Sequence, residues 1–454
     1  MRTAPKKKTA FFCTNCGAMH PRWQGQCREC TAWNTLHEET VVAPSASRRS
    51  SLTPPEAVTI PEISTEHQER ISAGVEEFDR VLGGGAVLGS AVLIGGEPGI
   101  GKSSLLLQIA DRYAVQGHHV LYLSGEESAP QIKARADRFG IKGETITVAN
   151  LTDLEAIIDL GQRDFQVIII DSIQTVASPA FDSPPGTVGQ VRESSARLIE
   201  LVKRSGKVLF LVGHITKDGS VAGPKVLEHM VDAVLYFEGD RYHLYRILRS
   251  QKNRFGPAGE IGVFEMTGSG LNEIKNPSRI FMTSDGATPA SGRIISAALE
   301  GSRTFLVEVE ALVASSPYGT PQRVASGIDG KRLAIILAVL EKRGGVMLGG
   351  SDVFVNIAGG IHLDDTALDL AFLLAAASSR LNLVTDGGML VVGEVGLSGD
   401  VRGVSQIERR LTEAAKLGLT KAIIPKSNTA GLVAPNSLEI ISVSTIEQAL
   451  EQIR

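Results

Sequence analysis

One short stretch constrains the fold more than any other part of the chain: Gly96-Glu97-Pro98-Gly99-Ile100-Gly101-Lys102-Ser103. It fits the pattern G-x-x-x-x-G-K-[ST], in which a glycine-rich loop wraps round phosphate groups. The apolar run 91–94 before it predicts a buried strand, and apolar residues at helical spacing predict a helix over 103–116. Strand, loop and helix in this order predict a nucleotide-binding site in an α/β fold.

The loop and the first turn of the helix are expected to bind ATP. Lys102 would reach the β/γ-phosphates, and the Ser103 hydroxyl would ligate Mg²⁺. The nucleotide-contacting residues are therefore predicted to be Gly96, Glu97, Pro98, Gly99, Ile100, Gly101, Lys102, Ser103 and Ser104. The alternative is a glycine turn that carries a lysine by chance.

Two later segments supply the carboxylates that hydrolysis needs. The apolar run 167–171 predicts a buried strand that ends at Asp171, placed to hold Mg²⁺ through its water shell. Glu126 and Glu127 follow a predicted strand at 119–124, at the strand end where open α/β sheets place their sites. The segment 123–128 resembles the one that carries the catalytic glutamate in RecA-fold motors, and by that match Glu126 is the first choice for the residue that activates water and Glu127 the second. The alternative is a solvated acidic pair.

Length and composition narrow the class of protein. A chain of 454 residues is expected to form two or three domains, and its net charge of −4 argues against a uniformly basic nucleic-acid binder. No apolar run reaches the length of a membrane span. Cysteines follow the basic N-terminus where a secretion signal needs an apolar core, so a cytoplasmic location without membrane contact is expected.

The four cysteines all fall near the N-terminus, as Cys13-x-x-Cys16 and Cys27-x-x-Cys30 with ten residues between the pairs. Two close pairs on facing turns supply the four thiolates of a tetrahedral Zn²⁺ site. Two disulfides are the alternative, disfavoured in a reducing compartment. We predict a zinc ribbon over 1–34 and, from its Ser, Pro, Thr and Glu content, a flexible linker over 35–69. Trp23 and Trp33 would either stack on bases or form the core of the ribbon.

Residues 71–85, which lead into the phosphate loop, resemble the entry segment of RecA-type ATPases, and this resemblance implies a RecA-like ATPase domain over 70–284. His214 ends a predicted strand at 208–213, and the resemblance to RecA-fold ATPases, in which a polar residue at this place senses the γ-phosphate, implies that role; the alternative is a structural histidine. Two long polar loops, at about 178–190 and 217–225, correspond in position to the DNA-binding loops of RecA-fold rings. Lys252 and Arg254, at i and i+2 on a strand, would point to the same face and could reach one phosphate group. Their segment resembles the one in replicative hexameric helicases that reaches the nucleotide of the next subunit; the alternative is a solvated basic turn.

With Lys252-Asn253-Arg254-Phe255-Gly256, the cysteine pairs and the phosphate loop, the chain resembles the RadA (Sms) family of bacterial DNA-repair proteins over essentially its full length. The resemblance implies a DNA-dependent, helicase-like ATPase that promotes branch migration of recombination intermediates. It implies a ring homo-oligomer, expected to be a hexamer, on single-stranded and branched DNA. RecA recombinase is a candidate partner.

The region 285–454 mixes strands with apolar helices, and Gly393 to Arg402 resembles the protease domain of Lon. By that match the serine of the Ser–Lys dyad falls at Ala367, or one residue earlier at Thr366, and the lysine falls at Glu408. We therefore expect an α+β, Lon-protease-like domain without peptidase activity. Four basic residues on one predicted helix would contact DNA, a neighbouring subunit or only solvent: Lys331, Arg332, Lys342 and Arg343.

Three other functions remain as alternatives at this stage. An ATP-dependent protease would need the dyad residues that are missing here. A non-motor switch of the circadian-clock ATPase type shares the Glu-Glu pair but leaves the zinc ribbon unexplained. A pure zinc adaptor would not need a complete hydrolytic site.

Overall fold

The computed structural model describes residues 7–42, 59, 69–179, 181–214, 224–239, 245–279, 281–282, 289–316 and 320–453. The chain divides into two compact units, Met1–Glu273 and Ile274–Arg454, and each is described by itself. No helix in these ranges is both long enough and apolar enough to cross a membrane.

The N-terminal ribbon is a small antiparallel sheet of β1 (Lys7–Cys13), β2 (Met19–His20) and β3 (Leu36–Val42), in the order β2-β1-β3. Strand β3 pairs with β1 along its whole length. The predicted boundary at residue 34 and the start of the predicted linker at residue 35 are therefore wrong. The ribbon extends to residue 42, because β1 needs a partner strand on its second edge. Of the remaining predicted linker, only residues 59 and 69 lie within the described ranges.

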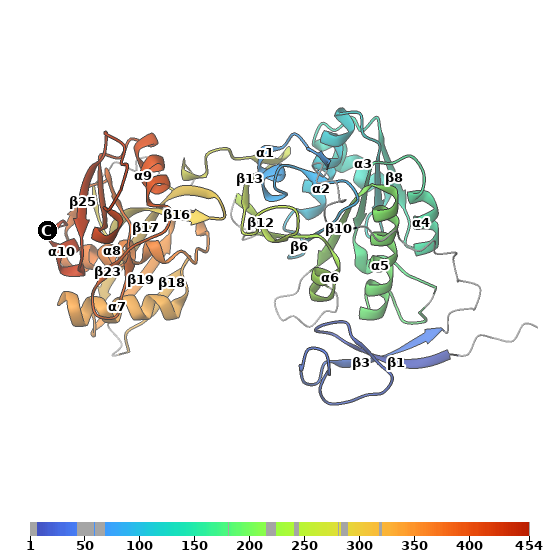
Figure 1. Ribbon diagram of the computed structural model, residues 1–454, viewed down its shortest axis with the longest axis horizontal. Coiled ribbons are helices and arrows are strands. Elements are labelled where there is room, and N and C mark those ends of the chain that lie inside the picture. Colours follow the sequence, from blue (N-terminus) through green and yellow to red (C-terminus); the bar gives the residue numbers. More distant parts are fainter. Residues whose placement is uncertain are drawn as a thin grey trace, which may run out of the picture. The chain divides into compact units, whose positions relative to one another are not determined.

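A nine-stranded sheet forms the centre of the first unit, in the order β14-β13-β12-β11-β6-β10-β9-β7-β8. Six strands run parallel: β6 (Ala91–Gly96), β7 (Val120–Ser124), β8 (Ile146–Asn150), β9 (Val167–Asp171), β10 (Val208–His214) and β11 (Ala233–Glu238). An antiparallel meander of β12 (Tyr245–Asn253), β13 (Ile261–Thr267) and β14 (Gly270–Glu273) extends it. The predicted α/β fold is confirmed (Figure 1).

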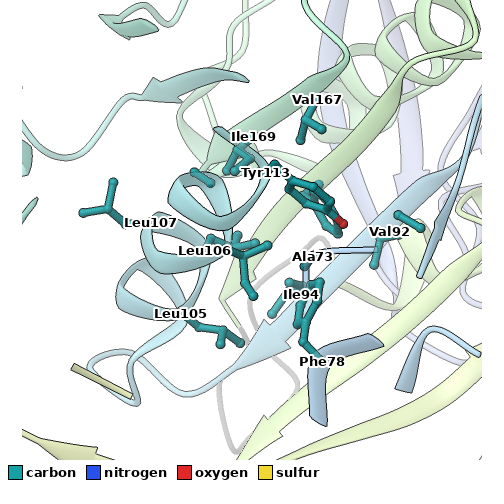
Figure 2. Close-up of a cluster of buried hydrophobic side chains, with 14 of the residues drawn as sticks. Ala73, Phe78, Val92, Ile94, Leu105, Leu106, Leu107, Tyr113, Val167 and Ile169 are labelled. Atoms are coloured by element: carbon teal, nitrogen blue, oxygen red, sulfur yellow. The ribbon is translucent and has the colours of Figure 1, made fainter. Parts of the chain in front are cut away.

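Helices cover both faces of this sheet, as parallel strands with crossover helices require. On one face lie α1 (Glu76–Val81), α2 (Lys102–Val115) and α3 (Ala129–Arg138), and on the other α4 (Leu154–Gly161), α5 (Val188–Ser205) and α6 (Pro224–Met230). Figure 2 shows the first of these cores, where Leu105 and Leu106 of α2 pack with Ile94 and Ile169 of the sheet. Alternate residues of β6 point into the two cores, so the strand is buried on both faces.

The second unit is an α+β fold around a seven-stranded mixed sheet, in the order β18-β19-β17-β16-β21-β24-β25. Its strands are β16 (Arg293–Glu300), β17 (Arg303–Ser315), β18 (Arg323–Ser326), β19 (Ser351–Ile357), β21 (Met389–Val391), β24 (Lys421–Pro425) and β25 (Glu439–Val443). The main helices are α7 (Gly330–Gly344), α8 (Asp369–Leu381), α9 (Ile407–Lys416) and α10 (Ile446–Glu451). Helix α8 packs on β16 and β17, and α7 packs on α8.

The boundary between the units lies earlier than the predicted 284/285. Ser278 accepts a hydrogen bond from the Leu306 amide of β17 at 3.0 Å, and the carbonyl of Phe281 accepts one from Glu308 at 2.8 Å. The rings of Phe281 and Phe305 pack with centroids 5.5 Å apart. Ser278 and Phe281 therefore pack on the sheet of the second unit, although both precede the predicted boundary.

A buried ion pair in the second unit provides a test of its stability. The side chain of Arg410 is only 1% exposed and lies 2.7 Å from the carboxylate of Asp365. Asp365→Asn leaves this cation unpaired and should destabilise the unit by about 3–5 kcal/mol. Hydrogen exchange of the α9 amides during urea unfolding of the full chain measures the change. The matched control is Asp364→Asn, whose carboxylate is 84% exposed, and it should change stability by less than about 0.5 kcal/mol. Equal stability of the two variants would contradict a stabilising role for the pair.

Candidate nucleotide and zinc sites

The phosphate loop leaves the carboxyl end of β6 and enters α2. Gly96 and Gly101 take φ values of 154° and 117°, which side chains with a Cβ rarely adopt. The amino group of Lys102 lies across the loop and donates hydrogen bonds to the carbonyls of Gly96 at 2.8 Å and Glu97 at 2.9 Å. The loop thus holds a cation at its centre, with the N-terminus of α2 beside it.

Burial makes this cation respond to bound charge. Lys102 is 3% exposed, and desolvation lowers the pKa of its amino group to about 8, although the carboxylates of Asp171 and Glu126 oppose the shift. A phosphate group placed on the loop would favour the charged amine and raise this pKa. The site is therefore built to gain electrostatic energy when an anion binds.

Asp171 ends β9 and is 4% exposed. The hydroxyl of Tyr122, on the adjacent β7, donates to Asp171 Oδ2 at 2.8 Å. Burial and the nearby Asp171 raise the pKa of Tyr122 well above its usual value, so the phenol stays a donor. Ser103 lies in the first turn of α2. A hydroxyl and a buried carboxylate are oxygen ligands of the kind that Mg²⁺ prefers. Mg²⁺ bound there would neutralise phosphate charge.

Glu126 faces this cluster. Its Oε1 accepts hydrogen bonds from Ser172 Oγ at 2.5 Å and from His214 Nε2 at 2.9 Å. The hydrogen bond from His214 lowers the pKa of Glu126 to about 2, with Ser172 and Lys102 acting in the same direction against desolvation. His214 ends β10 directly beside Gly96 of β6. Its Nδ1 is buried and has no hydrogen-bond partner among the described residues.

Glu127 points elsewhere. Its carboxylate forms an ion pair with Arg135 of α3, and its amide donates to Ser124 Oγ at 3.0 Å. Its carbonyl accepts from Asn150 at 3.0 Å. The structure thus separates the two neighbouring glutamates: Glu126 contacts the residues around the phosphate loop, and Glu127 braces α3 and β8.

Lys252 and Arg254 lie near the amino ends of the parallel strands, whereas the phosphate loop lies at their carboxyl ends. The Lys252 amino group donates to the carbonyls of Glu228 at 2.6 Å and Val231 at 2.9 Å, at the end of α6. Arg254 follows the end of β12 and lies 3.3 Å from Asp232, with its side chain half exposed. Lys252 and Arg254 were predicted to lie two residues apart on the same strand. Only Lys252 lies in β12, because the strand ends at Asn253.

Of the two predicted DNA loops, the first ends at Thr187, since α5 begins at Val188. Gln190, in the first turn of α5, organises this loop from inside. Its side chain accepts from the Ser178 amide at 2.7 Å and donates to the Ser183 carbonyl at 2.9 Å. Residues 217–223 of the second predicted loop lie outside the described ranges.

The four cysteine sulfurs come together in the ribbon. All four Sγ atoms lie within 4.8 Å of one another, and the pairs Cys13–Cys30 and Cys16–Cys27 are 3.6 Å apart. Tetrahedral zinc with Zn–S bonds of about 2.3 Å requires sulfur separations of this size. His20 Nε2 lies 3.4 Å from Cys27 Sγ, where an N–H group would stabilise a thiolate. The residues fit Zn²⁺, as the spacing of the cysteines predicts.

Comparison with known proteins identifies the family. The chain is 47% identical over 451 residues to "DNA repair protein RadA" of Halalkalibacterium halodurans, covering 98% of each chain. It is 46% identical to "DNA repair protein RadA" of Bacillus subtilis over 98% of each chain. It is also 48% identical to that of Pseudomonas aeruginosa over 99% of each chain. The chain belongs to the RadA family of DNA repair proteins.

Two family matches fall on the parts described above. Residues 71–160 match the ATPase family described as KaiC, and residues 11–38 match the family described as the rubredoxin metal binding domain. The predictions of a RecA-like ATPase domain and an N-terminal zinc ribbon are confirmed. The matched range of the ribbon runs past residue 34, in agreement with β3.

Three residues of the site escaped the sequence analysis. Ser172 binds Glu126, Tyr122 binds Asp171, and Gln174 lies 3.5 Å from the carbonyl of His214. Ser172 could have been found from its place directly after Asp171. Tyr122 and Gln174 could not, because their roles depend on which strands become neighbours in the sheet.

The lowered pKa of Lys102 predicts how nucleotide affinity varies with pH. The amine is charged below pH 8 and neutral above it, so ATP affinity should fall as pH rises from 7.5 to 9.5. The fall should approach about tenfold per pH unit at most, because one proton is taken up on binding. Equilibrium titration without Mg²⁺ measures it. Lys102→Ala should bind weakly with a flat profile over this range, and a flat profile in the parent would contradict the prediction.

Proposed function

We propose that this protein is a DNA-dependent ATPase of recombinational repair, assembled as a ring that moves on single-stranded DNA and promotes branch migration. The observation that carries the proposal is the meeting of Lys102, Asp171 and Glu126 at one edge of the sheet. That arrangement supplies a phosphate cradle, a metal-binding carboxylate and a carboxylate for water. Membership of the RadA family supports DNA repair as its setting.

In the proposed reaction Glu126 orients the attacking water and accepts its proton. A carboxylate with a pKa of about 2 is a weak base while His214 and Ser172 hold it. The γ-phosphate of bound ATP would offer His214 a stronger acceptor than Glu126. Transfer of the histidine hydrogen bond to the phosphate would then free Glu126 for water. This gives His214 the sensing role and ties turnover to the presence of the γ-phosphate.

The position of Arg254 supports a ring. Asn253 pairs with Ala233 of β11, and Ala233 in turn pairs with Val92 near the start of β6. The phosphate loop leaves β6 at its other end, at Gly96. Four residue steps separate Val92 from Gly96, a distance of roughly 13 Å along the strand. This separation supports the proposal that Arg254 serves another subunit rather than its own nucleotide. Lys252, held by the carbonyl of Glu228 in α6 and that of Val231 just after it, would position this segment, and Arg254 would carry the charge to the neighbour.

The proposed DNA contacts come from the loop 178–187 and from the ribbon. Trp23 and Trp33 are 58% and 68% exposed, so they do not form the core of the ribbon and are available to stack on bases. Single-stranded and branched DNA are the proposed ligands. RecA recombinase is a further proposed partner, as an enzyme that produces such branched intermediates.

The second unit is proposed to be a Lon-like scaffold without peptidase activity. Ala367 is buried, and Thr366 donates to Glu394 at 3.1 Å. At the lysine position, the Glu408 carboxylate accepts a hydrogen bond from the Val433 amide at 3.2 Å. A carboxylate cannot activate a hydroxyl as a neutral amine does. Of the four basic residues considered for contacts, Arg332 pairs with the buried Asp369. That leaves Lys331, Lys342 and Arg343 as the proposed contacts.

ATP turnover with and without single-stranded DNA, followed by unwinding of a forked duplex, tests the proposal. A motor should show faster turnover with DNA and should open the fork only with hydrolysable ATP. Turnover that does not respond to DNA would favour a non-motor switch. Degradation of casein in an ATP-dependent manner would favour a protease instead.

The two glutamates give a sharper prediction. Glu126→Gln should bind ATP but lose roughly 10²–10⁴ in turnover, because an amide cannot accept the proton of water. Glu127→Gln is the matched control, and it should keep most of the activity while losing the charge that pairs with Arg135. Single-turnover hydrolysis with separately measured ATP binding checks both. Normal turnover in Glu126→Gln with a slow Glu127→Gln would reverse the assignment.

A further inference from the structure

The zinc ribbon contacts the ATPase domain at the loop that leads into α5. The aromatic ring of Phe12 in β1 packs against that of Phe181 in the loop, with centroids 5.9 Å apart. Ala10 and Phe12 form a buried cluster with Val188, the first residue of α5. The ribbon therefore packs apolar side chains against Phe181 of the loop and Val188 of α5.

A buried carboxylate completes this contact. Glu39 of β3 is 6% exposed, and its Oε1 accepts a hydrogen bond from the Gly189 amide at 3.0 Å. The hydroxyls of Ser183 and Thr187 lie 3.2 and 3.4 Å from Oε2. Gly189 is the second residue of α5, whose first amides have no partner within the helix. The ribbon thus supplies the anion that caps this helix, and the charge also suits the helix dipole.

The fit requires glycine at position 189. A Cβ there would lie 2.2 Å from Glu39 Oε2 and 2.8 Å from the ring of Phe181. On the next turn of α5, Arg192 donates a hydrogen bond to the carbonyl of Gly17. Gly17 directly follows Cys16, and its amide donates to the carbonyl of Cys13 within the same cysteine turn. The turn that would hold zinc is therefore in direct contact with α5.

We propose that the zinc ribbon is a latch on the loop 178–187, in which Glu39 is the positioning residue and zinc keeps the latch folded. The proposal rests on the proposed function in one respect, namely that this loop contacts DNA. The loop begins six residues after Ser172, whose hydroxyl donates to Glu126, so a short segment of chain connects the latch to the hydrolytic site. Zinc binding by the ribbon would then set how strongly the ATPase responds to DNA.

Hydrogen exchange of the peptides covering 178–190 tests the latch without DNA, in the full-length zinc-loaded protein. Glu39→Ala and Gly189→Ala should each speed exchange by roughly tenfold to a hundredfold, since a hydrogen bond to a charged group is lost from the local opening equilibrium. Alanine favours helix more than glycine does, so faster exchange in Gly189→Ala would come from the broken contact. The control is Glu38→Ala, an exposed neighbour on β3, which should match the parent.

Zinc content and DNA response complete the test. Both variants should retain zinc, and both should need more single-stranded DNA for half-maximal ATPase stimulation while the maximal rate stays unchanged. Cys16→Ser, which removes a zinc ligand, should loosen the same loop. Parent-like exchange in both Glu39→Ala and Gly189→Ala would overturn the latch. If DNA did not stimulate the ATPase of the parent protein, the proposed function would be wrong. The exchange rates of the loop would still show whether the ribbon holds it in place.

Discussion

The buried amino group of Lys102 is the interaction on which the nucleotide site depends. Two backbone carbonyls of the phosphate loop hold it, and Asp171 and Glu126 supply opposite charge. These groups come from different strands and helices, and they meet because parallel strands end at the same edge of a sheet. The doubly covered sheet is therefore what brings the chemistry together, and its two apolar cores fix the positions of the strand ends.

The charges of the site are balanced so that it can respond to a ligand. Desolvation pushes Lys102 toward the neutral amine, while His214 and Ser172 keep Glu126 ionised. A bound polyphosphate would favour the charged form of Lys102 and would compete with Glu126 for the hydrogen bond from His214. The same residues thus account for the site without nucleotide and for its change when phosphate binds. Tyr122 stays a neutral donor to Asp171 and needs no change during this exchange.

The sequence predicted the features that a continuous motif or a strand end defines. The phosphate loop, Asp171 after its apolar strand and the cysteine pairs all carry their signal within a few neighbouring residues. Strand β3 was missed because its central residues 37–40 are all polar and show no alternation, and only pairing with β1 makes them a strand. Glu39 was missed for the same reason, since its partners lie far along the chain. The engagement of Lys252 by α6 also depends on contacts that no local pattern records.

The most direct test of the account is whether one subunit completes the site of the next. Arg254→Ala should be inactive, because an arginine that reaches the neighbouring subunit's γ-phosphate contributes roughly 10³ to 10⁵ in rate. Lys102→Ala should be inactive because its phosphate loop lacks the cation that binds the phosphates. Mixed rings of the two variants should regain part of the ATPase, because some interfaces pair an intact phosphate loop with an intact Arg254. Rings that mix Arg254→Ala with the double variant Lys102→Ala/Arg254→Ala should regain no ATPase activity, because no subunit supplies an intact Arg254. Co-purified mixed rings without recovered turnover would contradict the account and would place Arg254 within its own subunit or on DNA.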